Sequence, residues 1–279
     1  MKKTFRLFVA LLLVLTFTGC TSKPADEDKT IRVGVNPVPH AEILNNVVKG
    51  VLKEKGWDLE VVVFSDYVYP NTSLEDGELD ANYFQTLGYM NNQNEERGLH
   101  LVAVKGVHIE PMGLYSQKYT SIEAIPDGAE IAIPNDTDNG ARAIQFLVSK
   151  GLLKETELGD STWTKVYRDN AEINPHGYII TELEAAQLPL NLVDVDAAVI
   201  NGNYALGAEL PSKYPALTIE TFDAETSVRR TNFIVVKAGN ENSEKIKALI
   251  EAVTSPEVQK YIEDTYKGAV ITSFIDPQN

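Results

Sequence analysis

Arg142 is the side chain in this sequence best placed to bind an anion. It follows Asn139-Gly140, which we expect to open a helix, so Arg142 would lie in the first turn of that helix. The first amide groups of a helix lack partners within the helix and favour a carboxylate, and a guanidinium can bind a carboxylate through two parallel hydrogen bonds. The alternative is a solvated surface arginine, but the helix dipole disfavours a cation at this end. The position therefore predicts a carboxylate-binding site.

Two asparagines, Asn201 and Asn232, could complete the polar end of such a site. Ligands of open α/β sheets bind outside the carboxyl ends of the strands, and Asn201 follows a predicted strand. An asparagine side chain carries both a carbonyl and an amide, so it can bind either the ammonium or the carboxylate of an amino acid. For each asparagine taken alone, a turn residue at a strand end is the commoner use.

The sequence lacks the motifs of common enzymes and metal sites. It contains no G-x-S-x-G, P-loop, H-E-x-x-H or G-x-G-x-x-G pattern. Gly159-Asp160-Ser161 resembles part of a hydrolase motif, but no strand is predicted before it, so we expect a loop. None of the histidines has metal-ligand spacing from another, and a metal-binding two-lobed protein is only a minor alternative. We predict no enzyme, no metal and no cofactor; the histidines are His40, His100, His108 and His176.

The first twenty residues have the layout of a bacterial lipoprotein signal. Three basic residues precede an apolar run over residues 7–17, which is too short to span a membrane. Thr18-Gly19-Cys20 then places small residues before the only cysteine of the chain, as a lipoprotein peptidase requires. The alternative is an ordinary signal peptide, but it would leave a lone thiol in an exported protein. We predict a signal peptide over residues 1–19, lipidation at Cys20 and a flexible tether over residues 20–30.

The charge of the chain excludes nucleic acid as a partner. The formal net charge is −15, from 25 basic and 40 acidic residues. Removing the three basic residues of the signal lowers it to −18. Phosphate binding requires a basic face, which this composition does not favour. No later apolar run reaches transmembrane length, so we expect the membrane to hold the protein only through its lipid.

Apolar strands alternate with helical patterns along the mature chain, which indicates an α/β fold. Residues 31–35 and 59–64 are predicted strands joined by a helix over residues 43–52, which implies a parallel pair with a right-handed crossover. Further strands are expected near residues 80–84, 101–107, 112–116, 130–134, 177–180, 195–200, 217–220 and 232–237. Further helices are expected near residues 71–77, 85–97, 140–150, 181–191, 202–209 and 243–266, the last of which Pro256 could divide.

A weak internal repeat suggests two lobes. In each half a helix leads to an Asp-Ala pair at the start of a strand, first at Asp80-Ala81 and again at Asp196-Ala197, and an asparagine follows. Coincidence is the alternative, because Asp-Ala is a common dipeptide. Two lobes whose strand ends face each other would form a cleft. We predict one lobe from residues 31–112 plus 229–279 and a second from residues 113–228, joined by hinge strands near residues 110–115 and 230–235.

Seven motifs follow one another along the mature chain: VGVNPVPHAEIL (33–44), DYVYPN (66–71), GELDANYFQ (77–85), HIEPMGLYS (108–116), IAIPND (131–136) with NGAR (139–142), ELEAAQLP (182–189), and DVDAAVIN (194–201) with NYAL (203–206). In this order they resemble the NlpA family, the solute-binding lipoproteins of methionine-type ABC importers. The resemblance covers residues 31–236 and implies a two-lobed periplasmic-binding-protein fold of type II with the ligand in the inter-lobe cleft. It also implies that Arg142, Asn201 and Asn232 hold the backbone groups of the ligand.

The resemblance also suggests which residues surround the ligand's side chain. Tyr67, Tyr83 and Phe84 are the expected walls, because thioethers favour aromatic surroundings; core packing is the alternative. Only one of Tyr83 and Phe84 can face the ligand, because neighbouring residues of a strand point to opposite sides. His40, inside the first motif, and Thr86, where many family members have a histidine, complete the candidate ligand-binding residues.

The chain departs from the family pattern at two places that would affect the choice of ligand. One is Thr86, and the other is the stretch before Asn232, where Arg229 or Arg230 could bring positive charge to the mouth of the cleft. We therefore predict an extracytoplasmic, membrane-anchored binding protein that captures L-methionine or a related amino acid for an ABC transporter permease. A short methionine-containing peptide, another amino acid, or a surface lipoprotein without a transport role are the alternatives.

Overall fold

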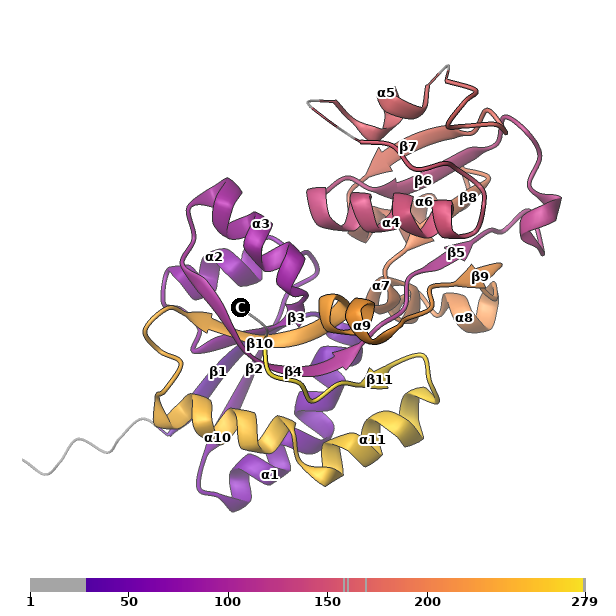
Figure 1. The fold of residues 1–279 in the computed structure, drawn as a ribbon. Coiled ribbons are helices and arrows are strands. Elements are labelled where there is room, and N and C mark those ends of the chain that lie inside the picture. The colour runs from indigo at the N-terminus through magenta and orange to yellow at the C-terminus, as the bar shows by residue number, and fades with distance from the viewer. Residues whose placement is uncertain (1–28, 158, 160, 169, 278–279) are drawn as a thin grey trace, which may run out of the picture.

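The polypeptide forms two α/β lobes, each built on its own sheet (Figure 1). The computed structural model describes residues 29–157, 159, 161–168 and 170–277. The predicted signal peptide, the predicted lipidation at Cys20 and most of the predicted tether lie outside the described residues. The expectation of an α/β fold with two lobes is confirmed.

The first lobe is organised around a six-stranded sheet in the order β11-β4-β10-β3-β1-β2. Strand β1 pairs in parallel with β2, as predicted, and also with β3. Strand β10 runs antiparallel between β3 and β4, and β11 is antiparallel to β4. The strands are β1 (Thr30–Val35), β2 (Asp58–Val63), β3 (Ala81–Gln85), β4 (Leu101–Ile109), β10 (Thr231–Lys237) and β11 (Ile271–Thr272).

Helices cover both faces of this sheet, so its central strands are apolar on both sides. Along β10, Ile234 and Val236 pack into one core with α10 and α11, whereas Phe233 and Val235 pack on the other side with Leu74. Pro256 does divide the predicted C-terminal helix in two. The helical segments are η1 (Pro37–Ala41), η2 (Leu44–Val48), α1 (Lys49–Glu54), α2 (Tyr69–Glu75), α3 (Leu87–Arg97), α10 (Glu244–Val253) and α11 (Pro256–Tyr266).

The second lobe contains a five-stranded sheet in the order β7-β6-β8-β5-β9. Ile131 and Ile133 of β6 pack against α4 and α5, whereas Ala132 faces the opposite core beside α6. Its strands are β5 (Gly113–Tyr115), β6 (Glu130–Pro134), β7 (Ile179–Leu183), β8 (Ala197–Ile200) and β9 (Thr218–Ile219). Its helical segments are η3 (Ile122–Ala124), α4 (Thr137–Ser149), α5 (Trp163–Tyr167), η4 (Ala185–Gln187), α6 (Leu188–Asn191), α7 (Gly202–Gly207) and α8 (Leu210–Lys213).

The chain passes between the two sheets twice. Residues 110–112 connect β4 of the first sheet to β5 of the second, and residues 220–230 return from β9 to β10. Helix α9 (Ala224–Arg230) lies in the return segment and begins with a capping box between Asp223 and Thr226. All strands of the second sheet therefore come from one continuous stretch, residues 113–219.

The repeated Asp-Ala pair has the same structural role in both lobes. Asp80 precedes β3 and accepts a hydrogen bond from the backbone N–H of Arg32 at 2.7 Å. Asp196 precedes β8 and accepts one from the backbone N–H of Glu130 at 2.9 Å. Each aspartate thus ties the start of its strand to the neighbouring parallel strand. The asparagines that follow differ, because Asn82 is buried among Asn71 and Gln85 instead of facing the cleft.

The predicted helix over residues 181–191 is wrong in its first part. Residues 179–183 form β7, because β6 offers a parallel partner to this edge, and helical structure begins only at Ala185. Besides the short segments η1 and η3, three α-helices and one strand of the described residues had no prediction. These four elements are α5, α8, α9 and β11. Three of these four have only two to five residues, too few for a hydrophobic period to be visible. Within the described residues, no helix has the length and apolar character needed to cross a bilayer.

Candidate ligand-binding site

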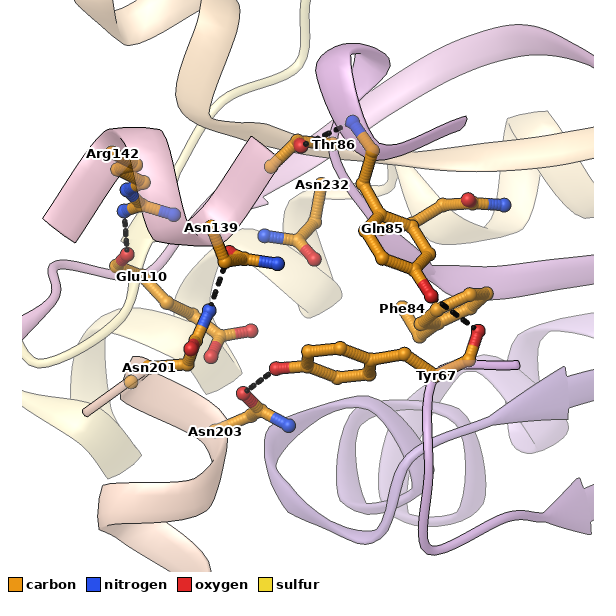
Figure 2. Close-up of a pocket in the computed structure, with 12 residues that line it drawn as sticks. Tyr67, Phe84, Gln85, Thr86, Glu110, Asn139, Arg142, Asn201, Asn203 and Asn232 are labelled. Carbon is orange, nitrogen blue, oxygen red and sulfur yellow. Dashed lines mark hydrogen bonds between the residues drawn. The ribbon is translucent and has the colours of Figure 1, made fainter. Parts of the chain in front are cut away.

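A pocket lies between the two lobes, with walls from both of them and from the segment that joins them (Figure 2). The space between its walls is about 360 Å³, part of which is open to solvent. Six of the eight predicted ligand-binding residues line it: Tyr67, Phe84, Thr86, Arg142, Asn201 and Asn232. The others that line it are Gln85, Tyr89, Glu110, Asn139, Gly202 and Asn203.

The start of helix α4 differs from the prediction. The helix begins at Thr137, not at Asn139, so Arg142 lies in the second turn. Asp136 is the N-cap, and its carboxylate accepts hydrogen bonds from the backbone N–H of Asn139 at 2.9 Å and from its side-chain amide. Burial raises the pKa of Asp136 to about 6. The protein thus supplies its own carboxylate to this helix end, and Arg142 must bind an anion through its guanidinium alone.

The Arg142 side chain is buried and already engages a carboxylate, that of Glu220. Its Nε lies 3.1 Å from both carboxylate oxygens of Glu220, and its Nη2 lies 2.5 Å from Oε2. Nη2 also donates to the backbone carbonyl of Glu110 at 2.9 Å. Arg230 approaches the same carboxylate, with Nε 3.4 Å from Oε1 of Glu220. Two guanidinium groups therefore share one carboxylate, and the trio keeps a net positive charge.

Both predicted arginines line a second hollow that Arg142 also borders, and Arg230 in addition approaches Glu220. Arg229 is exposed and pairs with Glu225 on the same helix. Arg230 is largely buried, donates to Gln145 of α4 at 3.2 Å and has a pKa lowered by that burial. Neither arginine lines the pocket. Arg230 is connected to the site through Glu220.

Asn201 and Glu110 place hydrogen-bond acceptors in the pocket. The Asn201 amide donates to Oδ1 of Asn139 at 2.7 Å. Its own Oδ1 is buried and has no hydrogen-bond partner among the described residues. Glu110 lies in the joining segment, lines the pocket and is also buried. A buried carbonyl and a buried carboxylate at this place favour a ligand that donates hydrogen bonds, such as an ammonium.

Glu110 belongs to a buried polar cluster behind the pocket. Its Oε1 lies 2.6 Å from Nε2 of His108 and 3.2 Å from Nε2 of His40. The Tyr83 hydroxyl bonds to Nδ1 of His108, and Nε2 of His40 lies 3.2 Å from Oδ1 of Asn232. Burial lowers the pKa of His40 to about 4 and that of His108 to about 3, and it raises the pKa of Glu110. Both imidazoles are therefore neutral at neutral pH.

Sequence spacing gave no indication of this cluster, because His40 and His108 are 68 positions apart in sequence but meet at Glu110. Their candidate ligand atoms and that of Glu110 lie within 4.8 Å of one another, as in a metal site. However, Oε1 of Glu110 is within hydrogen-bonding distance of both imidazoles, where an ion would need a separate position about 2.0–2.2 Å from each donor. We interpret the group as a hydrogen-bonded cluster.

Aromatic side chains form the opposite wall of the pocket. The rings of Tyr67, Phe84 and Tyr89 form a triangle, with Tyr67 at 5.8 Å from Phe84 and 5.6 Å from Tyr89, and Phe84 at 6.0 Å from Tyr89. The Tyr67 hydroxyl donates to Oδ1 of Asn203 in the second lobe at 2.6 Å. Of the neighbours Tyr83 and Phe84, only Phe84 lines the pocket, as strand alternation requires. Tyr83 instead faces the buried His108 and does not line the pocket.

Thr86 lines the pocket and is also the N-cap of α3, where its hydroxyl oxygen accepts from the backbone N–H of Tyr89. Its hydroxyl donates across the cleft to Asp138 at 3.2 Å. His40 does not line the pocket but contacts it through Asn232. Glu110 is the main residue that the prediction missed. A signal for it exists, because Glu110 is a single acid between the apolar end of a strand and Pro111-Met112.

Comparisons with known proteins agree with this architecture. The family model described as NlpA lipoprotein matches residues 31–274. The methionine-binding lipoprotein MetQ of Bacillus subtilis is 36% identical over 277 residues, which cover 97% of this chain and 98% of that protein.

Solved structures give the same result. A nutrient-binding protein from Burkholderia cenocepacia bound to methionine is 40% identical, with a TM-score of 0.79, and the match covers 88% of this chain and 100% of that chain. The substrate-binding protein of a methionine transporter from Streptococcus pneumoniae is 35% identical, with a TM-score of 0.79 and coverage of 88% and 96%. A family match over most of the sequence and relatives above 30% identity lead to one conclusion. The chain belongs to the NlpA lipoprotein family.

Proposed function

We propose that this protein binds methionine, or an amino acid closely related to it, between its two lobes and delivers it to an ABC importer. The observation that carries the proposal is the composition of the pocket. One end combines buried acceptors with the donors of Arg142 and Asn232, and the other end is aromatic. An α-amino acid with an apolar side chain has the matching arrangement of groups.

The polar end fits the ammonium and carboxylate of one amino acid. These two groups lie less than about 4 Å apart on covalent geometry, so one small cluster must bind both. Glu110 and Oδ1 of Asn201 would accept hydrogen bonds from the ammonium. Arg142 and the Asn232 amide would donate to the carboxylate. Because Glu220 holds one side of the Arg142 guanidinium, the ligand carboxylate would share the positive charge that Arg142 and Arg230 provide together.

The aromatic end fits a thioether. Tyr67, Phe84 and Tyr89 surround this part of the pocket, and a sulfur beside aromatic rings gains about 0.3–1.5 kcal/mol per contact. The relatives named for methionine support this choice of ligand. None of the proposed roles requires a bond to be broken, so we propose a binding protein and not an enzyme.

Lipidation of Cys20 would anchor the protein on the extracytoplasmic face of the membrane, next to the permease that receives the ligand. The signal layout and the lipoprotein family support this part of the proposal. We also propose the predicted lobe boundaries, residues 31–112 plus 229–279 and 113–228, which agree with the division of strands between the sheets. Replacing Cys20 by Ala should release the protein from membranes or leave the precursor uncleaved. Unchanged membrane fractionation and mass would contradict the anchor.

Native mass spectrometry followed by calorimetry tests the choice of ligand. The freshly purified protein should carry a bound mass equal to methionine, or should bind L-methionine after unfolding and refolding without ligand. D-methionine, leucine, glutamine and a methionine-containing dipeptide serve as competitors. Tighter binding of the dipeptide or of another amino acid would replace methionine as the ligand. Absence of binding to all of them would favour a surface lipoprotein without a transport role.

A further inference from the structure

Two buried histidines stand directly behind residues that line the pocket but do not line it themselves. His40 lies on η1 behind Asn232, and His108 lies at the end of β4 behind Glu110. They are 1% and 0% exposed, so water does not compete for their hydrogen bonds. The contacts among them therefore determine which atoms of Asn232 and Glu110 are left to face a ligand.

The proton on His40 can be assigned from its neighbours. Its Nε2 lies 3.2 Å from Oδ1 of Asn232 and 3.2 Å from Oε1 of Glu110. Both are acceptors, so the tautomer with the proton on Nε2 fits these contacts, and it leaves Nδ1 as a buried acceptor with no partner among the described residues. The Asn232 carbonyl is then held against His40, and the amide nitrogen at the other end of the same group points away from it. In Figure 2 this nitrogen lies on the side of Asn139 and Arg142.

The protons on His108 follow in the same way. Its Nε2 donates to Glu110 at 2.6 Å, so in the neutral ring Nδ1 is an acceptor. The Tyr83 hydroxyl is placed to donate to that Nδ1. Tyr83, His108 and Glu110 form a chain in which every donor meets an acceptor. In this arrangement the Glu110 carboxylate accepts from the protein on one side and keeps acceptor capacity for the pocket.

We propose that His40 and His108 are positioning residues that set the polarity of the pocket. His40 turns the Asn232 amide nitrogen toward the ligand carboxylate, and His108 holds Glu110 as an acceptor for the ligand ammonium. The proposal rests on the proposed function, the binding of an amino acid. It assigns opposite ends of the ligand to the two histidines, which a general role in packing would not do.

Calorimetry with two ligand analogues tests this assignment. Methioninamide lacks the carboxylate charge, and 4-(methylthio)butanoate lacks the ammonium. Replacing His40 by Leu should weaken methionine binding by roughly tenfold to a hundredfold, the value of a hydrogen bond to a charged group. The same change should weaken methioninamide binding much less. Replacing His108 by Leu should weaken methionine binding to a similar degree and 4-(methylthio)butanoate binding much less.

Conservative variants and a surface control separate positioning from stability. Replacing His40 or His108 by Gln places an amide N–H near the position of Nε2, so each should recover most of the lost affinity. His100→Leu is the control, because His100 is exposed and pairs with Glu75 on the first lobe. Thermal unfolding identifies variants that are only less stable.

The outcomes distinguish this inference from the proposed function. Equal losses for all three ligands, or affinities within about twofold of the parent in His40→Leu and His108→Leu, would overturn the inference while methionine binding stands. If the parent protein binds another amino acid, the same cycle applies to the amide and the deamino form of that ligand. A parent protein that binds no amino acid would overturn both.

Discussion

Arg142 has two roles in this structure: its guanidinium pairs with the Glu220 carboxylate, and its side chain lines the pocket. A guanidinium shared with a buried carboxylate is fixed in position before a ligand arrives, which lowers the entropy lost on binding. Arg230 contributes the second positive charge on Glu220. The carboxylate of a ligand would therefore meet a cation that is already oriented, and its charge would not be fully cancelled by the protein.

Replacing Arg142 by Ala should reduce methionine affinity by at least roughly a hundredfold. The reason is that removing one partner of a buried ion pair costs about 3–5 kcal/mol. Lys at this position should restore little, because an ammonium lacks the planar fork. Arg229→Ala is the matched control, since Arg229 is exposed and should leave affinity unchanged. Calorimetry provides the measurement. If the methionine affinity of Arg142→Ala is within threefold of that of the parent, other groups bind the carboxylate.

The buried histidines also make a prediction about pH. The pKa of His40 is lowered to about 4 and that of His108 to about 3, against about 6.5 in an unfolded chain. Between these values the unfolded state binds more protons, so the stability that depends on neutral imidazoles is complete above about pH 6.5 and is lost as the pH falls toward 4. Burial raises the pKa of Asp136 and of Glu110, which acts in the opposite direction.

A double variant separates the histidines from these carboxyl groups. His40→Gln/His108→Gln keeps Asp136 and Glu110 but has no imidazole to titrate at either position. The stability advantage of the parent over this variant should shrink as the pH falls from 7 to 5, measured by urea unfolding at each pH. An advantage that stays constant or grows over this range would show that the two imidazoles are not buried in the neutral form.

Most strands and helices could be predicted from local sequence patterns. The strands were predictable because buried parallel strands are short apolar runs, such as residues 31–35, between turn residues. The helix expected over residues 181–191 failed because β7 forms through pairing with β6, a long-range contact that no local pattern contains. For the same reason the sequence could place Arg142 and Asn201 in the site, but not the meeting of His40, His108 and Glu110.

The N-cap of α4 links the stability of an element to the site. Asp136→Ala should cost about 0.5–2 kcal/mol of stability, because the backbone N–H of Asn139 loses its acceptor. It should also weaken methionine binding, since α4 carries Asn139 and Arg142 into the pocket. Ser255→Ala removes the corresponding cap of α11, far from the pocket, and should lower stability alone. If both variants affect binding equally, the cap of α4 has no special connection with the site.

In this structure the two lobes are closed on each other. Tyr67 donates to Asn203, and the Tyr204 hydroxyl donates to the backbone carbonyl of Ser65 at 3.2 Å. At the other side of the cleft, Thr137 donates to Glu96 at 2.8 Å. Helix α7 packs against η1 of the first lobe. Closure thus depends on how near α7 can come to the joining segment.

Gly202 allows α7 to lie close to the joining segment. A Cβ at this position would lie 2.7 Å from Cβ of Glu110 and 3.0 Å from the carbonyl oxygen of Pro111. Gly202→Ala should therefore hold α7 away from the joining segment, weaken methionine binding and leave the molecule more open. Gly207→Ala, in the same helix with nothing within 4 Å of its added Cβ, is the matched control.

Small-angle scattering with and without methionine provides the measurement. Ligand should bring the parent and Gly207→Ala from an open form into the closed arrangement described here and so make them more compact, whereas Gly202→Ala should not reach the same radius of gyration. Full compaction of Gly202→Ala would mean that the joining segment moves aside, and compaction in none of the three would mean that the lobes do not move on binding.

The place of β10 has a consequence for how the polypeptide is made. This strand sits between β3 and β4, yet it follows the whole second sheet in the sequence. A chain that is synthesised and exported from its N-terminus would complete residues 113–219 while β3 and β4 still lack the strand between them. The second lobe can fold first. Until β10 is available, β3 and β4 of the first lobe keep apolar edges without a partner strand. Such edges favour aggregation, so the nascent protein would depend most on chaperones before residue 237 emerges.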